Sequence, residues 1–497
     1  MSCPFDAGHL FNLTSSVYNN NQLPVAQSAK DTLLQLIREG QPLSKGQQLQ
    51  LTFSLSLPAI LANVSAMVMQ FIDAAMVGQL GADDSASVGL MGTTNWLFEG
   101  VLSAFAAGYA VQVAHLLGAK RNADARQMVR QALVVCLLFS LLLAGLGLVL
   151  CRPLPVWLGA EPHIRANATI YFGTFMLFVP FFMLDIVASS MLRSSGNMRI
   201  PSALNIMMCV LDVIFNFFLI FPTRSVTLFG HTMTMPGAGL GVMGAALGTA
   251  CAGLVVSLFM VFYLVFKSAD LRLTIDRGSF KPDWPTFKKA VSISSPMGLQ
   301  HVMMCSASIV ITGIVAPLGS IALAANSFGI TAESLCYMSG YGIADAATTL
   351  VGQSLGAGRK RLTRSFAWIT VLSGMAIMGS MAVLMYVFST ELMGLMSPVP
   401  QVVELGARCL RVEAWAEPLF AAAIISYGVF VGAGYTLVPC GINLVSMWIV
   451  RLGLSAIMVK SMGLYGVWMA MAIELCFRGT VYLLWLSSKR WMKTVID

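Results

Sequence analysis

The sequence predicts an all-α polytopic membrane protein, with twelve transmembrane helices in two pseudo-symmetric bundles of six. Three observations support this fold class. The 497-residue chain is 57% hydrophobic and only 10% charged, which excludes an ordinary soluble domain or a disordered chain. Apolar runs of about 20 residues, each long enough to cross a bilayer, recur along the whole chain. The second half of the sequence also repeats the first.

Twelve apolar runs are predicted to cross the membrane. They lie near residues 50–78, 88–117, 127–151, 166–192, 200–222, 237–266, 288–316, 321–355, 365–388, 403–431, 437–459 and 463–487. The first 45 residues are polar, with one short amphipathic segment, DTLLQLIRE, and without the pattern of a cleaved signal peptide. The ten cysteines show no spacing typical of a zinc site or a disulfide framework.

The basic residues predict the orientation. An even number of crossings places both termini on one side. If that side is cytoplasmic, the inner segments hold 22 of the 30 Lys and Arg residues and the outer loops hold five. The positive-inside rule therefore predicts cytoplasmic termini in the cell membrane. The formal net charge of +8 then comes mostly from the Lys and Arg residues that set the membrane orientation, and we expect no nucleic-acid partner.

An internal repeat relates the two halves. At an offset of 238 residues, four of the six prolines between residues 58 and 220 meet another proline. The pairs are Pro58 with Pro296, Pro162 with Pro400, Pro180 with Pro418, and Pro201 with Pro439. The offset falls to 222 in the sixth run, because the first half carries about 16 extra residues in the outer loop TRSVTLFGHTMTMPGA. Six crossings per half place both halves in the membrane in the same orientation.

The repeat divides the chain into five parts. We expect a polar cytoplasmic segment at 1–45, an N-terminal six-helix bundle at 46–266, a basic cytoplasmic linker at 267–287, a C-terminal six-helix bundle at 288–487 and a cytoplasmic tail at 488–497. Many secondary transporters place a substrate cavity between two such repeats. No GxxxxGK[ST] phosphate loop is present, so nothing in the sequence indicates ATP hydrolysis.

Several motifs resemble those of the multidrug and toxic compound extrusion (MATE) family. They are FIDAAMVGQLG in the first run, VAHLLGAKR and VGQSLGAGR after the second and eighth runs, the stretch MLRSSGNMRIPSALNIMMCVLDVIFNFFLIFP, and GVMGAALGT in the sixth run. The resemblance covers roughly residues 45 to 490. It implies two lobes in a V shape and export of organic cations or other amphipathic compounds in exchange for Na⁺ or H⁺. We therefore expect no cofactor beyond that ion, small amphipathic substrates and membrane lipids as partners, and a monomer.

Carboxylates in the first half are the candidate coupling site. Asp73 lies within an apolar run, where a charge is costly unless something neutralises it, and it matches the acidic residue of the family's first-span motif. Asp212 and Asn216 lie four residues apart on one helix face, in the reverse of the order found in many relatives. Thr249 matches a hydroxyl-bearing position of the same family site. With Asp185 nearby, we expect these residues to hold the coupling cation, and hydrogen bonding between helices is the alternative.

A substrate cavity is expected between the halves. Its candidate residues are Glu99, Trp96, Glu333, Asp345 and Glu417. Carboxylates would attract a cationic substrate, and an aromatic ring would contact it through cation–π interaction. One branch of the family carries a Glu in the seventh span where this chain has Met304, and this favours a first-half mechanism like that of the DinF-like branch.

Other polar groups in the runs have structural explanations. Glu474 and Arg478 are spaced to form an ion pair on one helix, and Glu413 shares a face with Glu417. His301 is expected to contact a neighbouring helix. Four prolines within the runs are candidate hinges, with static kinks as the alternative: Pro58, Pro180, Pro296 and Pro418.

Three other functions fit the sequence less well. A lipid-linked precursor flippase can have a similar two-lobed fold, but it requires a strongly cationic cavity, whereas the first half is acidic. An intramembrane enzyme is not expected, because HExxH and GxSxG motifs are absent. A channel could also use buried acids, yet duplicated halves with prolines inside the helices favour bundles that rock against each other.

Overall fold

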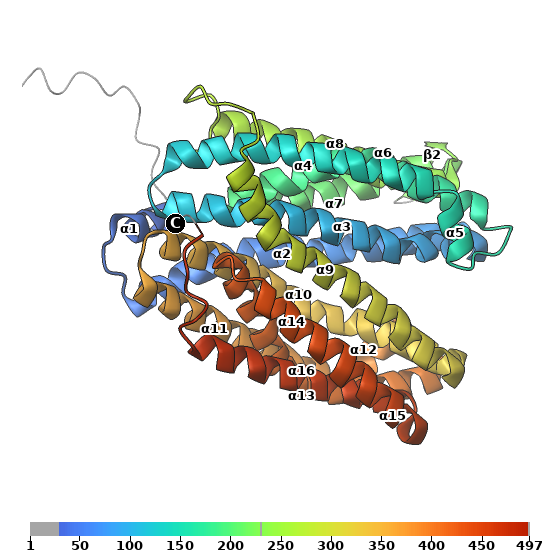
Figure 1. Ribbon diagram of the computed structural model, residues 1–497. Coiled ribbons are helices and arrows are strands. Elements are labelled where there is room, and N and C mark those ends of the chain that lie inside the picture. The colour runs from blue at the N-terminus through green and yellow to red at the C-terminus, as the bar shows by residue number, and fades with distance from the viewer. Residues whose placement is uncertain (1–28, 229–230, 496–497) are drawn as a thin grey trace, which may run out of the picture.

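The computed structural model describes residues 29–228 and 231–495, and long helices make up nearly all of this part of the chain. The helices form two lobes that lie side by side (Figure 1). The first half of the sequence builds the N-lobe and the second half builds the C-lobe. We call the end that carries the first helix, α1 (Ala29–Glu39), the α1 end, and the opposite end, which carries a short β-hairpin, the hairpin end.

Six long helices build the N-lobe, each where an apolar run predicts one. They are α2 (Lys45–Gly78), α3 (Ala82–Gly118), α4 (Asn122–Leu150), α6 (Arg165–Ser194), α7 (Arg199–Ile220) and α8 (Gly241–Phe262). Two short elements accompany them: α5 (Pro153–Trp157) at the hairpin end and a π-helical turn, η1 (Tyr263–Lys267), that continues α8.

The C-lobe repeats this order. Five of its crossings are single helices, namely α9 (Trp284–Val315), α10 (Ser320–Gly356), α11 (Lys360–Val387), α13 (Pro400–Gly432) and α16 (Leu464–Ser487). The remaining crossing joins α14 (Leu437–Val445), the π-helical turn η3 (Ser446–Arg451) and α15 (Leu452–Met462). The short helices η2 (Ala316–Leu318) and α12 (Ser389–Met396) follow α9 and α11.

Eleven helical stretches in the described residues are long and apolar enough to cross a membrane. The twelfth predicted crossing, α10, has 37 residues but is rich in Gly, Ala, Ser and Thr, and most of it is buried among neighbouring helices. A helix enclosed by protein needs a less apolar surface than one that faces lipid. Since α10 runs between the two ends like the others, the predicted fold class of two six-helix bundles is confirmed.

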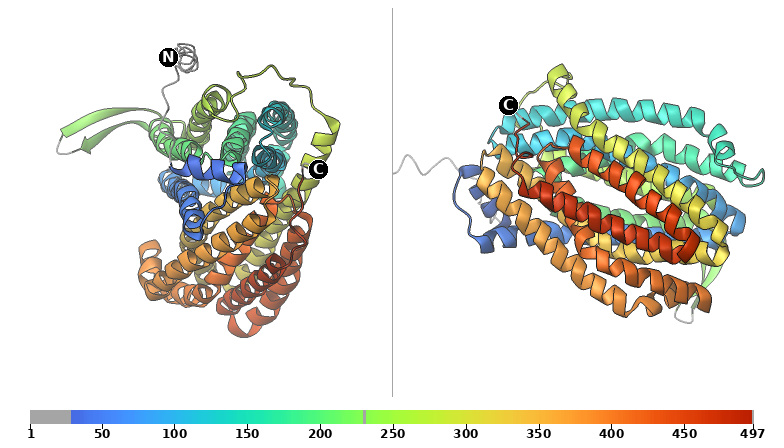
Figure 2. Two further views of the ribbon diagram at one scale, coloured as in Figure 1. Left: turned by 90° about the vertical axis from the view of Figure 1, so that its left-hand side faces the viewer. Right: turned by 60° about the horizontal axis from the view of Figure 1, so that its bottom comes forward.

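The extra outer loop of the first half forms a two-stranded antiparallel hairpin. Its strands are β1 (Pro222–Leu228) and β2 (His231–Ala238), with Pro222 opposite Ala238 and Leu228 opposite His231. The hairpin projects from the hairpin end, away from the helices (Figure 2, left). It is the one strand pair among the described residues and is a small addition to an otherwise helical protein.

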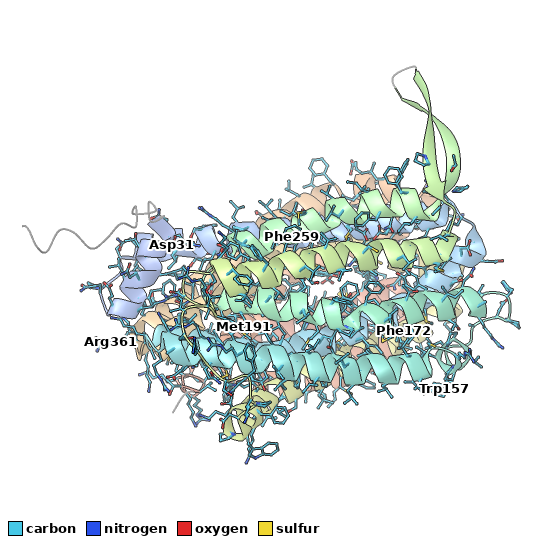
Figure 3. All side chains as sticks on the ribbon, turned by 90° about the horizontal axis from the view of Figure 1, so that it is seen from above. Asp31, Trp157, Phe172, Met191, Phe259 and Arg361 are labelled. Carbon is cyan, nitrogen blue, oxygen red and sulfur yellow. The ribbon has the colours of Figure 1, made fainter. Side chains whose placement is uncertain are left out.

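Apolar side chains occur both inside the lobes and on their outer surface. Phe172 and Met191 belong to the N-lobe core and are fully buried, whereas Phe259 and Trp157 are 54% and 69% exposed (Figure 3). Exposed apolar side chains on long helices are typical of a surface that contacts lipid. The molecule is therefore an integral membrane protein that crosses the bilayer many times.

Local sequence signals explain where two key helices begin. Before α2, the Ser44 hydroxyl accepts a hydrogen bond from the Gln47 amide, and the Gln47 side chain accepts one from the Ser44 amide. This capping box satisfies two backbone donors at the helix start. The Asp283 side chain accepts a bond from the Thr286 amide in the same way at the start of α9.

The lobes meet along α2 with α10 and along α3 with α9. At Gly342 the backbones approach so closely that an added Cβ would lie 2.6 Å from the Ile60 nitrogen. Among the described residues, the hydrogen bond between the lobes that lies furthest toward the hairpin end joins the Ser334 hydroxyl to the Met67 sulfur at 3.3 Å. The other bonds between the lobes lie nearer the α1 end, so the interface is tightest there.

Helix α1 lies across the α1 end and contacts both lobes (Figure 2, left). Leu33, Leu34 and Ile37 are buried against α2, α10 and α11. Lys30 donates to the Gly196 carbonyl of the N-lobe, and the Arg359 guanidinium of the C-lobe donates to backbone carbonyls of α1. The amphipathic segment DTLLQLIRE thus forms a helix that connects the lobes.

The linker between the lobes packs against the α1 end of α4. Asp276 forms ion pairs with Arg126 at 2.6 Å and with Arg130 at 2.5 Å. The hydrogen bond from Arg130 is the main cause that holds the pKa of Asp276 below its usual range. The linker is also joined to α1, because Arg38 forms an ion pair with Asp270 at 2.8 Å.

Candidate functional site

Two carboxylates and an amide meet inside the N-lobe. The Asn216 side-chain nitrogen donates to Asp73 Oδ1 at 2.9 Å and to Asp212 Oδ2 at 3.1 Å. Asp212 and Asn216 are almost fully buried on α7, and Asp73 reaches them from α2. The two carboxylates also lie within hydrogen-bonding reach of each other. The structure therefore brings together three of the residues predicted for the coupling site.

Helix α8 completes this cluster. The Thr249 hydroxyl donates to the Ala245 carbonyl at 3.3 Å and lies close to Asp212. The preceding residue, Gly248, faces Asn216 so closely that an added Cβ would overlap the Asn216 side-chain oxygen. The small residues of GAALGT thus allow α8 to approach α7. We call Asp73, Asp212, Asn216 and Thr249 the N-lobe acidic cluster.

The charge of the N-lobe acidic cluster is not balanced by a nearby base. Within the described residues, neither Asp73 nor Asp212 forms an ion pair with Lys, Arg or His. One oxygen of Asp212 and the side-chain oxygen of Asn216 are buried and have no hydrogen-bond partner in the ranges 29–228 and 231–495. Two adjacent carboxylates in a low-dielectric interior repel each other unless a cation or a proton lies between them. The oxygens are the ligand type that a hard cation prefers.

The other predicted N-lobe residues lie around this cluster. Asp185, on α6, has a buried oxygen without a hydrogen-bond partner, and no hydrogen bond joins it to Asp73 or Asp212 among the described residues. Glu99 and Trp96 are exposed on α3, and Trp96 is 51% exposed. Tyr171, which the sequence did not indicate, lies close enough to Asp73, Glu99 and Asp212 to interact with all three charges.

A second acidic cluster lies inside the C-lobe. Glu333 of α10 and Glu413 and Glu417 of α13 are buried, and one oxygen of each lies within 4.8 Å of the others. Both oxygens of Glu413 and both oxygens of Glu417 are buried without a hydrogen-bond partner among the described residues, and the Cys336 thiol lies near Glu417. Glu333 and Glu417 were predicted for the substrate cavity. The structure places them instead in a tightly packed interior.

Basic residues accompany the C-lobe acids. Glu474 and Arg478 form the predicted ion pair at 3.0 Å, and the Ser446 hydroxyl donates to Glu474 at 2.5 Å. Arg451 lies close enough to interact with Glu333 and Glu413. In the part of the chain that the structure describes, the N-lobe acidic cluster has no such partners, so the two lobes differ in electrostatic character despite their shared architecture.

Asp345 has a different environment from the other predicted cavity residues. It forms an ion pair at 2.7 Å with Arg193 of the N-lobe. The neighbouring Thr349 and Gln353 side chains donate to the Arg193 and Ser194 carbonyls at 3.0 and 2.7 Å. The ion pair of Asp345 and these two hydrogen bonds thus hold the lobes together near the α1 end.

The four predicted hinge prolines all lie within helices. Pro58 is in α2, Pro180 in α6, Pro296 in α9 and Pro418 in α13. Each removes one backbone hydrogen bond from its helix. His301 packs against Gly100 of α3, as expected for a residue at a helix contact.

Comparison with known proteins relates the whole architecture to one family. The MatE family profile matches residues 58–218 and again residues 296–457, so its two matches begin 238 residues apart, the offset of the internal repeat. A probable multidrug resistance protein NorM from Thermotoga maritima is 26% identical over 447 residues, covering 89% of this chain and 93% of the relative. A probable NorM from Chromobacterium violaceum is 28% identical over 446 residues, with 88% and 93% covered.

Solved structures agree with this assignment at the level of the fold. The outward-facing conformation of a multidrug resistance MATE family transporter aligns with a TM-score of 0.81 at 18% identity, covering 91% of this chain and 97% of the other. The Vibrio cholerae MATE transporter VcmN in the bent form aligns with a TM-score of 0.75 at 20% identity, with 93% and 98% covered.

Proposed function

Because the chain belongs to the MatE family of transporters, we propose that it exports small amphipathic or cationic compounds and couples their export to entry of Na⁺ or H⁺. The relatives described above are named as probable multidrug resistance proteins, and the chain matches nearly their whole length. The mechanism is alternating access, in which the two lobes rock about a central cavity.

The N-lobe acidic cluster is the observation that carries the coupling mechanism. Asp73 and Asp212 lie side by side in membrane-spanning helices, share the Asn216 amide and have no basic partner among the described residues. A bound cation or proton would relieve their repulsion, and its release would restore that repulsion. A cation or proton bound at the N-lobe acidic cluster can therefore favour one arrangement of α2, α7 and α8 over another.

The arrangement of the lobes supports an outward-facing state. We place the α1 end in the cytoplasm, because the predicted inner segments hold most of the Lys and Arg residues. The bonds between the lobes concentrate at that end, including the Arg193–Asp345 ion pair. A substrate cavity would then open toward the hairpin end, with Glu99, Trp96 and Tyr171 on its N-lobe side.

Efflux from proteoliposomes tests this proposal. The purified protein would be reconstituted with a fluorescent organic cation inside the vesicles, and efflux would be driven by an inward Na⁺ gradient or an inward proton gradient. We expect one gradient to drive efflux by the wild-type protein and Asp73→Asn to abolish it. Asp124→Asn is the matched control, because Asp124 is an exposed carboxylate at the start of α4 that pairs with Arg121.

Two results would contradict the proposal in different ways. Normal gradient-driven efflux by Asp73→Asn would remove the coupling role from the N-lobe acidic cluster while leaving export intact. If neither gradient moves any organic cation through the wild-type protein, export itself is refuted. Transbilayer movement of a lipid-linked precursor would then be the next activity to assay.

A further inference from the structure

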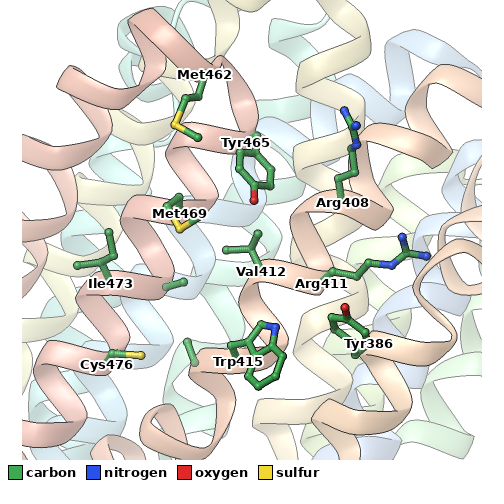
Figure 4. Close-up of a pocket in the computed structure, with 12 residues that line it drawn as sticks. Tyr386, Arg408, Arg411, Val412, Trp415, Met462, Tyr465, Met469, Ile473 and Cys476 are labelled. Carbon is green, nitrogen blue, oxygen red and sulfur yellow. The ribbon is translucent and has the colours of Figure 1, made fainter.

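A deep groove lies on the C-lobe, outside both acidic clusters. Its volume is about 940 Å³, and residues of α13 and α16 form most of its lining. Arg408 and Tyr465 lie near one end of the groove, and Trp415 and Cys476 lie near the other (Figure 4). Trp415 is 77% exposed, so the groove is open at the surface.

The groove lies on the lipid-facing side of the C-lobe. All of its lining residues come from α11, α13, α15 and α16, and among the described residues none of them bonds to the N-lobe. In Figure 2 (right), α11 and α16 lie on the side of the C-lobe that faces the viewer, with the N-lobe behind. A transported compound in a cavity between the lobes would not pass through it.

The positions of Arg408 and Arg411 along α13 indicate how deep they lie in the bilayer. In α13, which begins at Pro400, Arg408 and Arg411 lie eight and eleven residues in, or about 12 and 16 Å along the axis. The helix has 33 residues and is about 50 Å long, whereas the hydrocarbon core is about 30 Å thick. About 10 Å of helix thus extends beyond the core at each end, which places both arginines just inside the hydrocarbon boundary.

The acidic residues Glu404, four residues before Arg408 on α13, and Glu391, next to Thr390 on α12, do not line the groove. Arg411 donates to the Ser389 hydroxyl at 2.9 Å and to the Thr390 hydroxyl at 3.2 Å, and both partners are neutral. Among the described residues, neither Arg408 nor Arg411 forms an ion pair, and the groove lining contains no Asp or Glu. The bonds to Ser389 and Thr390 fix the guanidinium of Arg411 at the rim. Two cations at this depth attract phosphate oxygens strongly.

The rest of the groove suits an acyl chain. Trp415 and Cys476 line the groove beyond Arg411, whereas Ile473 lies level with Arg411 and Met469 lies between the levels of the two arginines (Figure 4). Tyr386 and Trp415 meet edge to face with ring centroids 6.1 Å apart, which forms one aromatic wall. The groove therefore combines two arginines just inside the hydrocarbon boundary with an apolar lining that continues toward the bilayer centre.

We propose that this groove binds one anionic phospholipid of the leaflet at the hairpin end. Its phosphate lies against Arg408 and Arg411, and an acyl chain lies along Trp415 and Ile473. The lipid connects α13 and α16, so it stabilises the C-lobe without entering the transport pathway. The proposal rests on charge and shape and does not depend on the identity of the transported compound.

Native mass spectrometry of the purified protein in a neutral detergent tests the proposal. Phosphatidylglycerol would be titrated against phosphatidylcholine with the wild-type protein and the double variant Arg408→Gln/Arg411→Gln. We expect one tightly bound phosphatidylglycerol in the wild-type protein, and at least a tenfold weaker affinity in the double variant. Arg152→Gln, which removes an exposed arginine at the same end of the N-lobe, is expected to bind like the wild type.

One further variant and two competition experiments test whether a phospholipid, rather than free phosphate or an organic cation, binds in the groove. Ile473→Trp fills the acyl channel while leaving both arginines in place, so it is expected to weaken lipid binding even if the double variant fails to fold. Equal binding by the wild type and Ile473→Trp would overturn the proposal. It would also be overturned if inorganic phosphate displaced the lipid at equal concentration, or if a fluorescent organic cation occupied the groove in its place.

Discussion

Docking of α1 is predicted to control how often the lobes separate at the α1 end. Ile37 is fully buried between α1 and the lobes, and Leu33 and Leu34 pack beside it. Replacing a buried Ile by Ala costs about 2–5 kcal/mol. Since 1.36 kcal/mol corresponds to a factor of ten, Ile37→Ala should raise the undocked population of α1 by about 30-fold to several thousand-fold.

The assay follows from the length of α1. A helix of 11 residues is marginal in water on its own, so undocked α1 unfolds and its amides exchange with solvent. Hydrogen–deuterium exchange of Ile37→Ala should show faster exchange in residues 29–39. The matched control is Gln35→Ala, because Gln35 is exposed on the opposite face and bonds only to Glu39 among the described residues.

The same variant should change the arrangement of the lobes, because α1 contacts both of them. Spin labels at Lys120 in the N-lobe and Lys360 in the C-lobe, both exposed at the α1 end, would report their separation. We expect Ile37→Ala to increase the fraction of long distances. Unchanged exchange in α1 would refute the estimated docking energy. Faster exchange without any change in the label distances would refute the claim that α1 holds the lobes together.

Three further perturbations have defined outcomes. Asp345→Asn removes a partly exposed ion pair with Arg193 worth about 0.5–1 kcal/mol, so spin-label distances should show about two- to fivefold more separation of the lobes at the α1 end. The folded protein holds the pKa of Asp276 below its usual value of about 4, so the ion pairs that hold the linker against α4 should be fully formed above pH 4. They should be lost as the pH falls through the lower pKa of the folded state, and faster hydrogen–deuterium exchange of residues 268–280 would report this loss. Gly248→Ala would push the Asn216 side chain aside, so coupled efflux should fall; unchanged efflux would contradict the role of Asn216.

Features that depend on neighbours along one helix could be predicted from the sequence. The twelve apolar runs correspond to the observed crossings because length and hydropathy are properties of a single segment. The Glu474–Arg478 ion pair and the shared face of Asp212 and Asn216 follow from a spacing of four residues. The meeting of Asp73 with Asp212 could be expected only through the family motif.

Features that depend on packing between distant segments could not be predicted in this way. Asp345 was assigned to the substrate cavity, but its partner Arg193 lies 152 residues away in the other lobe. Glu333 joins Glu413 and Glu417 because α10 packs against α13, and no spacing in the sequence indicates which faces meet. The amphipathic pattern of α1 indicated a helix, yet its contact with both lobes depends on surfaces that only the folded bundles create.

The central claim is that the N-lobe acidic cluster binds the coupling cation in competition with substrate. Equilibrium binding of a fluorescent organic cation to the purified protein, measured across Na⁺ concentration and pH, tests it most directly. Thermodynamic linkage predicts that substrate Kd rises with the coupling ion in the wild type, and that Asp73→Asn removes this dependence. The claim is contradicted if the Asn variant binds substrate with the same ion dependence as the wild type.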